Sequence, residues 1–255
     1  MTRFSANLGF LWTDRALPDA VRAAHAAGFD AVECHWPYDI ATGDVAAALA
    51  ETGLAMLGLN TRRGDVTAGE NGLAALPGRA DEARAAIDEA LAYAAAIGAG
   101  AIHVMAGKAE GADAQAIFAA NLHYACRQAA EGGQIILIEP LNPYDAPGYF
   151  LNTTTQAADI ITEIDAPNLK LMFDCYHVGR SEGDVLARLR ALWPIIGHIQ
   201  FAAVPDRGPP DHGDLDYRMI FAEVAAQAWS KPLGAEYRST GKTDDSLGWM
   251  AQLRG

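Results

Sequence analysis

Residues 134–139 read Gln-Ile-Ile-Leu-Ile-Glu, a short apolar run that ends in a carboxylate. Residues 169–174, Leu-Lys-Leu-Met-Phe-Asp, repeat this arrangement further along the chain. Nearly continuous apolar runs are typical of parallel strands that are covered on both faces. We therefore expect a buried parallel strand at each position. Each would carry an acidic residue at its carboxyl end, the edge of the sheet at which α/β proteins bind their ligands.

Similar segments recur along the chain and alternate with alanine-rich stretches of helical periodicity. Within 80–97, apolar residues at helical spacing predict one buried face, formed by Ala83, Ile87, Ala90, Ala94 and Ile97. The expected strands are Arg3–Leu8, Ala31–Cys34, Ala55–Leu59, Ala101–Met105, Gln134–Glu139, Leu169–Asp174, Gly197–Phe201 and Leu233–Tyr237. The expected helices span 15–27, 44–52, 80–97, 113–131, 154–164, 183–192 and 216–228, and Thr153 with Gln156 predicts a capping box before the fifth of them.

The number of strands, their alternation with helices and the length of 255 residues predict an α/β fold, a single (β/α)8 TIM barrel in which 1–255 form one domain. A doubly wound open sheet is the main alternative. Such a sheet would carry a glycine-rich phosphate loop after its first strand, but residues 7–12 read Asn-Leu-Gly-Phe-Leu-Trp. Two long loops, Asn60–Arg79 and Ala202–Asp214, follow strands and would lie on the catalytic face of a barrel.

The composition excludes several classes of function. The chain has 32 acidic and 19 basic residues, and its net charge of −13 disfavours a nucleic-acid partner. Its longest apolar runs are strand-sized, so we expect no membrane span, and no secretory signal precedes the first strand. Three scattered cysteines are typical of a reduced chain without a structural zinc cluster. We expect a cytoplasmic enzyme; the sequence is also compatible with a homo-oligomer.

Polar side chains lie at the carboxyl end of the last four expected strands, or one residue before it, and follow mostly apolar runs: Glu139, Asp174, Gln200 and Glu236. Adjacent strands lie about 4.8 Å apart, so these side chains could converge at the catalytic rim. Three carboxylates so close together would repel one another unless a cation lay between them. Individually, each could instead cap an element or pair with an arginine. Together they predict an all-oxygen divalent-metal site that suits Mg²⁺ or Mn²⁺ better than Zn²⁺.

Glu139 and Glu236 come from opposite sides of this group, and two carboxylates flanking a chelated substrate suit proton transfer through an enediolate. His177, three residues after Asp174, could point into the same pocket or bond only backbone. His103 lies inside a strand, where a core role and a substrate contact are both open.

Two basic residues on rim loops could bind an anionic substrate. Arg207 could hold a carboxylate with two parallel hydrogen bonds, and Lys108 could contribute as a point charge. A solvated surface position is the alternative for both. The remaining histidines are interpreted as structural or exposed, although His198 alternates with Gln200 and could share its inward face; they are His25, His35, His123 and His198.

Long segments of the chain resemble the hydroxypyruvate isomerase family, within the xylose-isomerase-like barrels. They are Gly28–Glu33, Ala74–Arg79, His103–Gly107, Ile138–Pro143 and Pro147–Leu151, followed by Asn168–Leu171 with Asp174, Tyr176 and His177, and by His198–Gln200, Val204–Pro205 and Glu236–Arg238. The resemblance implies that Glu139 and Glu236 are the two proton-transfer residues. It also implies that Glu139, Asp174, Gln200 and Glu236 bind the divalent metal.

The resemblance fails at one place. After Arg207 the family usually continues His-Glu-Pro-Gly-Thr-Gly-Glu, whereas residues 208–214 here read Gly-Pro-Pro-Asp-His-Gly-Asp. His212 and Asp214 could restore part of the missing polarity from shifted positions. The substitution leaves the metal chemistry in place and bears on the identity of the substrate.

These observations predict a metal-assisted aldose–ketose isomerase of a small anionic 2-oxo acid, most simply one that converts hydroxypyruvate to 2-hydroxy-3-oxopropanoate (tartronate semialdehyde). Isomerisation of a 2-oxo-tetronate and 3-epimerisation of a free ketose are the alternatives. A non-catalytic sugar-acid binding protein is a different class that the carboxylates disfavour. DNA-repair nucleases share the barrel superfamily, but the net charge of −13 and the lack of a histidine-rich multi-metal set argue against that class.

Overall fold

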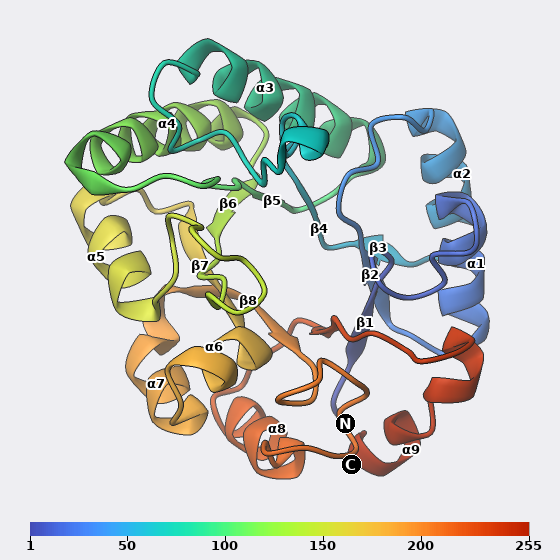
Figure 1. Ribbon diagram of the computed structural model, residues 1–255. Helices are drawn as coiled ribbons and strands as arrows, with labels where there is room; N and C mark the ends of the chain where they lie inside the picture. Colours follow the sequence, from blue (N-terminus) through green and yellow to red (C-terminus); the bar gives the residue numbers. More distant parts are fainter. Residues whose placement is uncertain (255) are drawn as a thin grey trace.

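The computed structural model describes residues 1–254, and its strands form a parallel barrel with the helices outside it (Figure 1). The strands are β1 (Phe4–Asn7), β2 (Ala31–Glu33), β3 (Ala55–Met56), β4 (Gly58–Asn60), β5 (Ala101–His103), β6 (Ile135–Ile138), β7 (Leu169–Asp174), β8 (Ile196–Phe201) and β9 (Leu233–Ala235). Their order in the sheet is β3-β2-β1-β9-β8-β7-β6-β5-β4. The predicted α/β barrel is confirmed.

The third predicted strand, Ala55–Leu59, is divided into β3 and β4 on either side of Leu57. The division arises because the first half pairs with β2 and the second half with β5. The two ends of the sheet meet here, since the Cys34 amide also donates to the Gly58 carbonyl at 3.1 Å. One interrupted strand therefore closes the barrel.

The helices are α1 (Leu17–Ala26), α2 (Thr42–Thr52), α3 (Ala80–Ile97), α4 (Gly111–Glu131), α5 (Thr154–Ile164), α6 (Cys175–Ser181), α7 (Val185–Leu192), α8 (Tyr217–Ala226) and α9 (Trp249–Leu253). The short helices α6 and α9 were not predicted. The apolar face predicted for α3 is buried throughout. Thr153 caps α5 as predicted, because its side-chain hydroxyl accepts from the backbone amide of Gln156 at 3.1 Å. No helix of residues 1–254 is long and apolar enough to cross a bilayer.

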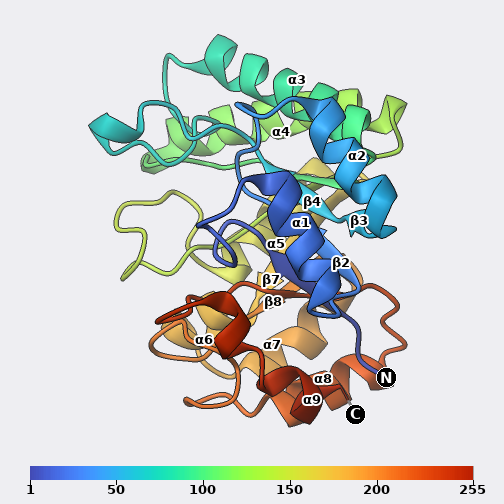
Figure 2. The same cartoon turned by 90° about the vertical axis from the view of Figure 1, so that its right-hand side faces the viewer.

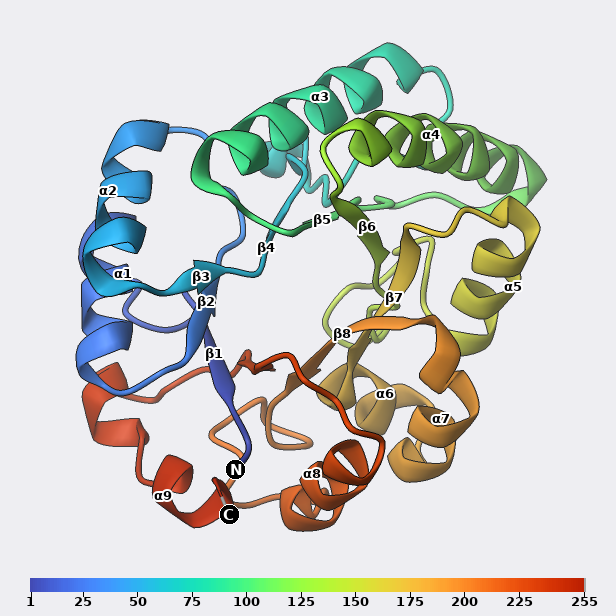
Figure 3. The same cartoon turned by 180° about the vertical axis from the view of Figure 1, so that it is seen from behind.

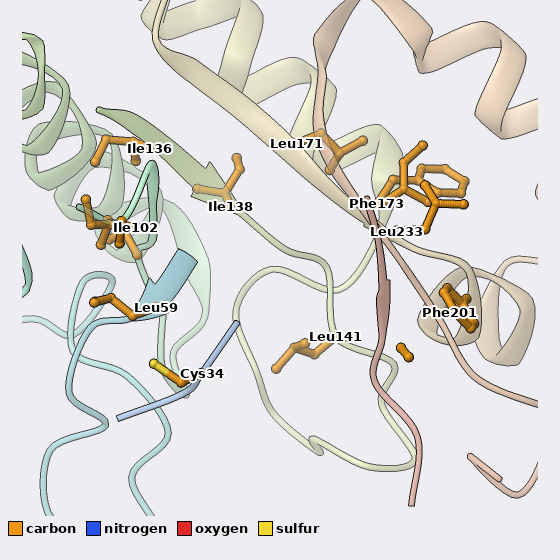
Figure 4. Packing of buried hydrophobic residues seen from close by; sticks show 14 of the residues in the cluster. Cys34, Leu59, Ile102, Ile136, Ile138, Leu141, Leu171, Phe173, Phe201 and Leu233 are labelled. Carbon is orange, nitrogen blue, oxygen red and sulfur yellow. The ribbon is translucent and has the colours of Figure 1, made fainter. Parts of the chain in front are cut away.

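Side chains alternate between the inside of the barrel and the surrounding helices. In β7, Leu171 and Phe173 belong to the large apolar cluster between sheet and helices, and Figure 4 shows them with the equivalent residues of neighbouring strands. Met172 lies on the other face, in a small interior cluster with Ala101 and Leu137. Asp174 has the same parity as Met172, so this alternation directs it into the barrel.

Long loops gather at the carboxyl end of the strands, on the left in Figure 2. The loop after β4 contains a short 3₁₀-helix, Val66–Ala68, and returns to the barrel at Gly72, which forms a bridge with Ala106. Gly72 has φ +120°, and a Cβ there would stand 2.6 Å from the carbonyl oxygen of Met105, so only glycine fits. The chain termini lie at the opposite end, which faces the viewer in Figure 3.

Candidate active site

The four polar residues predicted to converge lie at the carboxyl rim inside the barrel. Glu139 directly follows β6, Asp174 is the last residue of β7, Gln200 lies near the end of β8, and Glu236 directly follows β9. Asp174 and Gln200 are paired in the register of β7 and β8, so they occupy the same level. All four side chains are buried.

Three of these residues, together with His177, form a compact cluster. One ligand atom from each of Glu139, Asp174, His177 and Glu236 lies within 4.8 Å of the others. Among the described residues, Glu139 Oε1, Asp174 Oδ2 and Gln200 Oε1 are buried without a hydrogen-bond partner. Leaving buried oxygens unpaired is costly, and a cation coordinated by them would remove that cost. The residues present therefore fit a divalent metal ion.

Glu236 is held by donors on both of its oxygens. Asn7 Nδ2 donates to Oε1 at 2.9 Å, and His35 Nε2 lies 3.0 Å from the same atom. Arg207 Nη2 donates to Oε2 at 2.6 Å. Burial by itself would raise the pKa of Glu236, but the charge of Arg207 and the hydrogen bond from His35 lower that pKa below its usual range.

Among the described residues, no charged side chain donates a hydrogen bond to either of the other two carboxylates, and the nearest guanidinium nitrogen of Arg207 lies 3.8 Å from Asp174 Oδ2. Burial, reinforced by the charges of Glu236 and Asp174, raises the pKa of Glu139 well above its usual value. Burial and the charge of Glu236 likewise raise the pKa of Asp174 to about 8. The cluster thus joins one firmly ionised carboxylate to two whose ionised forms need additional positive charge.

His177 lies on α6, which starts directly after Asp174. The carboxylate of Asp174 caps this helix by accepting from the Tyr176 amide at 2.8 Å. The backbone amide of Asn142 donates to His177 Nδ1 at 2.9 Å, so the neutral ring carries its proton on Nε2. Burial and the charge of Arg207 lower the pKa of His177 to about 3, which keeps the ring neutral. His177 therefore presents a donor to the cluster, 3.7 Å from Asp174 Oδ2.

The remaining predicted residues line a cavity of about 390 Å³, which Glu139, His177 and Glu236 also line. His103 is buried in its wall, with Nδ1 3.6 Å from Glu139 Oε2 and neither ring nitrogen hydrogen-bonded. Lys108 lies exposed at the rim. Arg207 is buried and engaged with Glu236.

Several residues of the site were not identified from the sequence. His35 was interpreted as structural or exposed, but it lies in the cavity wall against Glu236. Asn7 ends β1 on the inward face, so strand parity could have identified it. Arg63 and Arg238 stack on Trp36 and Phe10 at the cavity mouth, an arrangement that depends on loop geometry.

The cluster predicts a pH dependence of metal stabilisation. Folded, metal-free protein keeps a proton on Asp174 up to about pH 8, whereas the unfolded chain releases it near pH 4. The folded state then binds more protons, so its stability falls as pH rises through this range. We expect the rise in Tm caused by Mn²⁺ to grow from about pH 5 to about pH 8.

Thermal unfolding with Mn²⁺ and with chelator at several pH values measures this effect. Asp174→Asn is the control, because removing the titrating carboxyl should flatten the pH dependence of the metal-free protein. Equal Tm values with metal and chelator at every pH would contradict the metal site.

The xylose isomerase-like TIM barrel family matches residues 21–253. The chain is 43% identical to a 2-oxo-tetronate isomerase of Cupriavidus necator and 34% identical to a hydroxypyruvate isomerase of Escherichia coli, in both cases over the full length of both chains. The solved structure of an AP endonuclease family 2 protein of Brucella melitensis superposes with a TM-score of 0.95 at 34% identity and 99% coverage of each chain. The chain belongs to the xylose isomerase-like TIM barrel family, in the group that includes hydroxypyruvate and 2-oxo-tetronate isomerases.

Proposed function

We propose that this protein is a metal-dependent aldose–ketose isomerase of a small anionic 2-oxo acid, most simply hydroxypyruvate, which it converts to 2-hydroxy-3-oxopropanoate. The observation that carries the proposal is the group of buried, unpartnered oxygens on Glu139, Asp174 and Gln200 beside ionised Glu236. The names of the full-length relatives support the same reaction class.

Glu139, Asp174, Gln200 and Glu236 would hold the cation. A set of oxygen donors favours Mg²⁺ or Mn²⁺ over Zn²⁺. His177 does not alter this preference, because its cluster-facing nitrogen carries a proton and cannot ligate. When bound, the cation supplies Lewis-acid stabilisation of the negative charge that develops on the substrate's carbonyl and hydroxyl oxygens.

Two glutamates would move the proton. Glu139 follows β6 and Glu236 follows β9, so they approach the cavity from separate strands, with β7 and β8 between them. One carboxylate would remove the carbon-bound proton and the other would complete the transfer on the neighbouring carbon. His177 Nε2–H and His103 would contact the substrate oxygens from the cavity wall.

Positively charged side chains at the cavity mouth support an anionic substrate. Lys108, Arg63 and Arg238 line the cavity, and none of the ion pairs formed within residues 1–254 involves them. Unpaired cations in a chain of net charge −13 would attract a carboxylate to this end of the barrel. Arg207 would face the substrate from deeper in the cavity while it holds Glu236.

A 2-oxo-tetronate is the second candidate substrate, and the loop after Arg207 favours it. The two ring nitrogens of His212 lie 2.8 Å from Asp206 Oδ2 and 2.9 Å from Asp211 Oδ1, so this polar group faces its own loop. None of residues 208–214 lines the cavity. The missing polar groups leave room for a longer acid, in keeping with the 43% identity to a 2-oxo-tetronate isomerase.

The state of the cysteines supports a reducing compartment. Cys34, Cys126 and Cys175 are free and buried, which is typical of a reducing environment. We infer a cytoplasmic enzyme that acts on a small molecule and not on nucleic acid.

Substituting either glutamate should reduce turnover strongly without unfolding the protein. Glu139→Gln and Glu236→Gln each keep the side-chain shape but remove a proton-transfer group. We expect kcat to fall by about 10²–10⁴-fold at saturating Mn²⁺. Circular dichroism would verify the fold, and near-native turnover in either variant would refute the two-carboxylate mechanism.

A substrate panel separates the candidate reactions. Purified protein is assayed with hydroxypyruvate, 2-oxo-tetronates and free ketohexoses, with Mg²⁺ and with Mn²⁺. We expect isomerisation of 2-oxo acids, with kcat/KM values that decide the preferred chain length. Turnover of ketoses alone would establish the epimerase alternative, and binding of acids without turnover would indicate a binding protein.

Removing a positively charged side chain at the cavity mouth should weaken binding of the 2-oxo acid substrate. We expect Lys108→Met to raise KM by about two- to fivefold, as for an exposed ion pair, with little change in kcat. The effect should shrink as ionic strength rises. Lys242→Met is the matched control, because Lys242 is exposed but does not line the cavity. Equal KM values for both variants would exclude Lys108 from substrate binding.

A further inference from the structure

A second buried polar group lies next to the candidate metal ligands and has no part in the proton transfer described above. Glu33, the last residue of β2, extends into the barrel toward His198 and Gln200 of β8, and all three side chains are buried. Its Oε2 atom lies 2.8 Å from His198 Nε2 and accepts from Gln200 Nε2 at 3.2 Å.

The hydrogen bond between Glu33 and Gln200 determines which end of the Gln200 amide is left without a partner. A glutamine amide has an oxygen and a nitrogen of similar size, and only the oxygen can coordinate a cation. The amide nitrogen is the donor in this hydrogen bond and Glu33 Oε2 is the acceptor, so Glu33 holds the nitrogen end of the amide. Gln200 Oε1 is consequently left buried and unpartnered, next to Asp174 in the sheet register.

Two neighbours fix Glu33 itself. His198 bonds the same carboxylate oxygen that accepts from Gln200, which restrains the carboxylate within the barrel. Gly234 on β9, the strand between β1 and β8, leaves the space through which Glu33 reaches β8. A Cβ at Gly234 would overlap Glu33 Oε1 and would stand 2.8 Å from Gln200 Cγ and 3.0 Å from His198 Nε2.

We propose that Glu33 is a positioning residue that, restrained by His198, turns the Gln200 amide so that its oxygen faces the metal site. The inference rests on the proposed function only in that Gln200 binds the cation. Without Glu33 the amide rotates freely between two orientations, and in one of them its NH₂ group opposes the cation. Partners of this kind change metal affinity by about 10–100-fold in other sites.

Calorimetric titration with Mn²⁺ tests the proposal through affinity and not through turnover. The variants are Glu33→Gln, Gln200→Ala and the double variant, with Glu131→Gln on the exposed end of α4 as the control for loss of one negative charge. We expect Glu33→Gln to weaken Mn²⁺ binding about 10–100-fold. In the Gln200→Ala background the same substitution should change affinity by less than about twofold, because no amide remains to be oriented.

A merely structural role for Glu33 predicts the same loss of affinity in both backgrounds, and that result would overturn the proposal. Unchanged affinity in Glu33→Gln would also overturn it.

The proposed function can fail separately. If wild-type protein binds Mn²⁺ with the expected coupling but isomerises no 2-oxo acid, the reaction is wrong and the positioning role stands. If it isomerises 2-oxo acids while Glu33→Gln binds Mn²⁺ normally, the positioning role alone is wrong. A wild-type protein that binds no divalent cation would refute both.

Discussion

Three carboxylates buried within a few ångströms of one another are the constraint on which the rest of the site depends. Burial and mutual repulsion raise the free energy of the ionised forms of Glu139 and Asp174, as the raised pKa of each carboxyl shows. The strongest compensation is at one carboxylate. Glu236 receives hydrogen bonds from Asn7 and Arg207 and lies 3.0 Å from a ring nitrogen of His35. As a result, Glu236 is stably ionised, whereas Glu139 and Asp174 each keep a buried oxygen without a hydrogen-bond partner. A divalent cation bound to these oxygens would supply the missing positive charge.

Strand parity explains why the fold and the convergence of these residues were predictable from the sequence. Side chains alternate along a strand between the outward face, which packs on the helices, and the inward face. In β7, Phe173 faces outward, so the next residue, Asp174, must face inward. The end of each apolar run gives the level in the barrel, so the four polar side chains were expected at one rim without any knowledge of tertiary contacts. The register of β7 and β8 places Asp174 opposite Gln200 at that level. Regular repetition of strand and helix did the same for the barrel as a whole.

Contacts across the barrel lay beyond sequence reasoning. His35 follows β2 without any periodic pattern, yet it meets Glu236, 201 positions away in sequence. The third strand divides because its halves have different partners, which is a consequence of closure and not of local propensity. Helix α6 has seven residues, too few for a visible period, and it starts where it does because Asp174 caps it.

Under the proposed function, Arg207 would link the metal centre to the substrate. Its guanidinium donates to Glu236 at 2.6 Å and also lies 3.8 Å from Asp174 Oδ2, so both carboxylates draw on its charge. A divalent cation held by the same carboxylates would take over part of that neutralisation and leave more of the charge of Arg207 for an incoming acid. Under the proposed function, a bound metal ion would therefore raise the affinity for the anionic substrate. By thermodynamic linkage, bound substrate would raise the affinity for the metal by the same factor. The loop after Arg207 can then vary in polarity without disturbing the chemistry, because Arg207 reaches the centre through its own side chain.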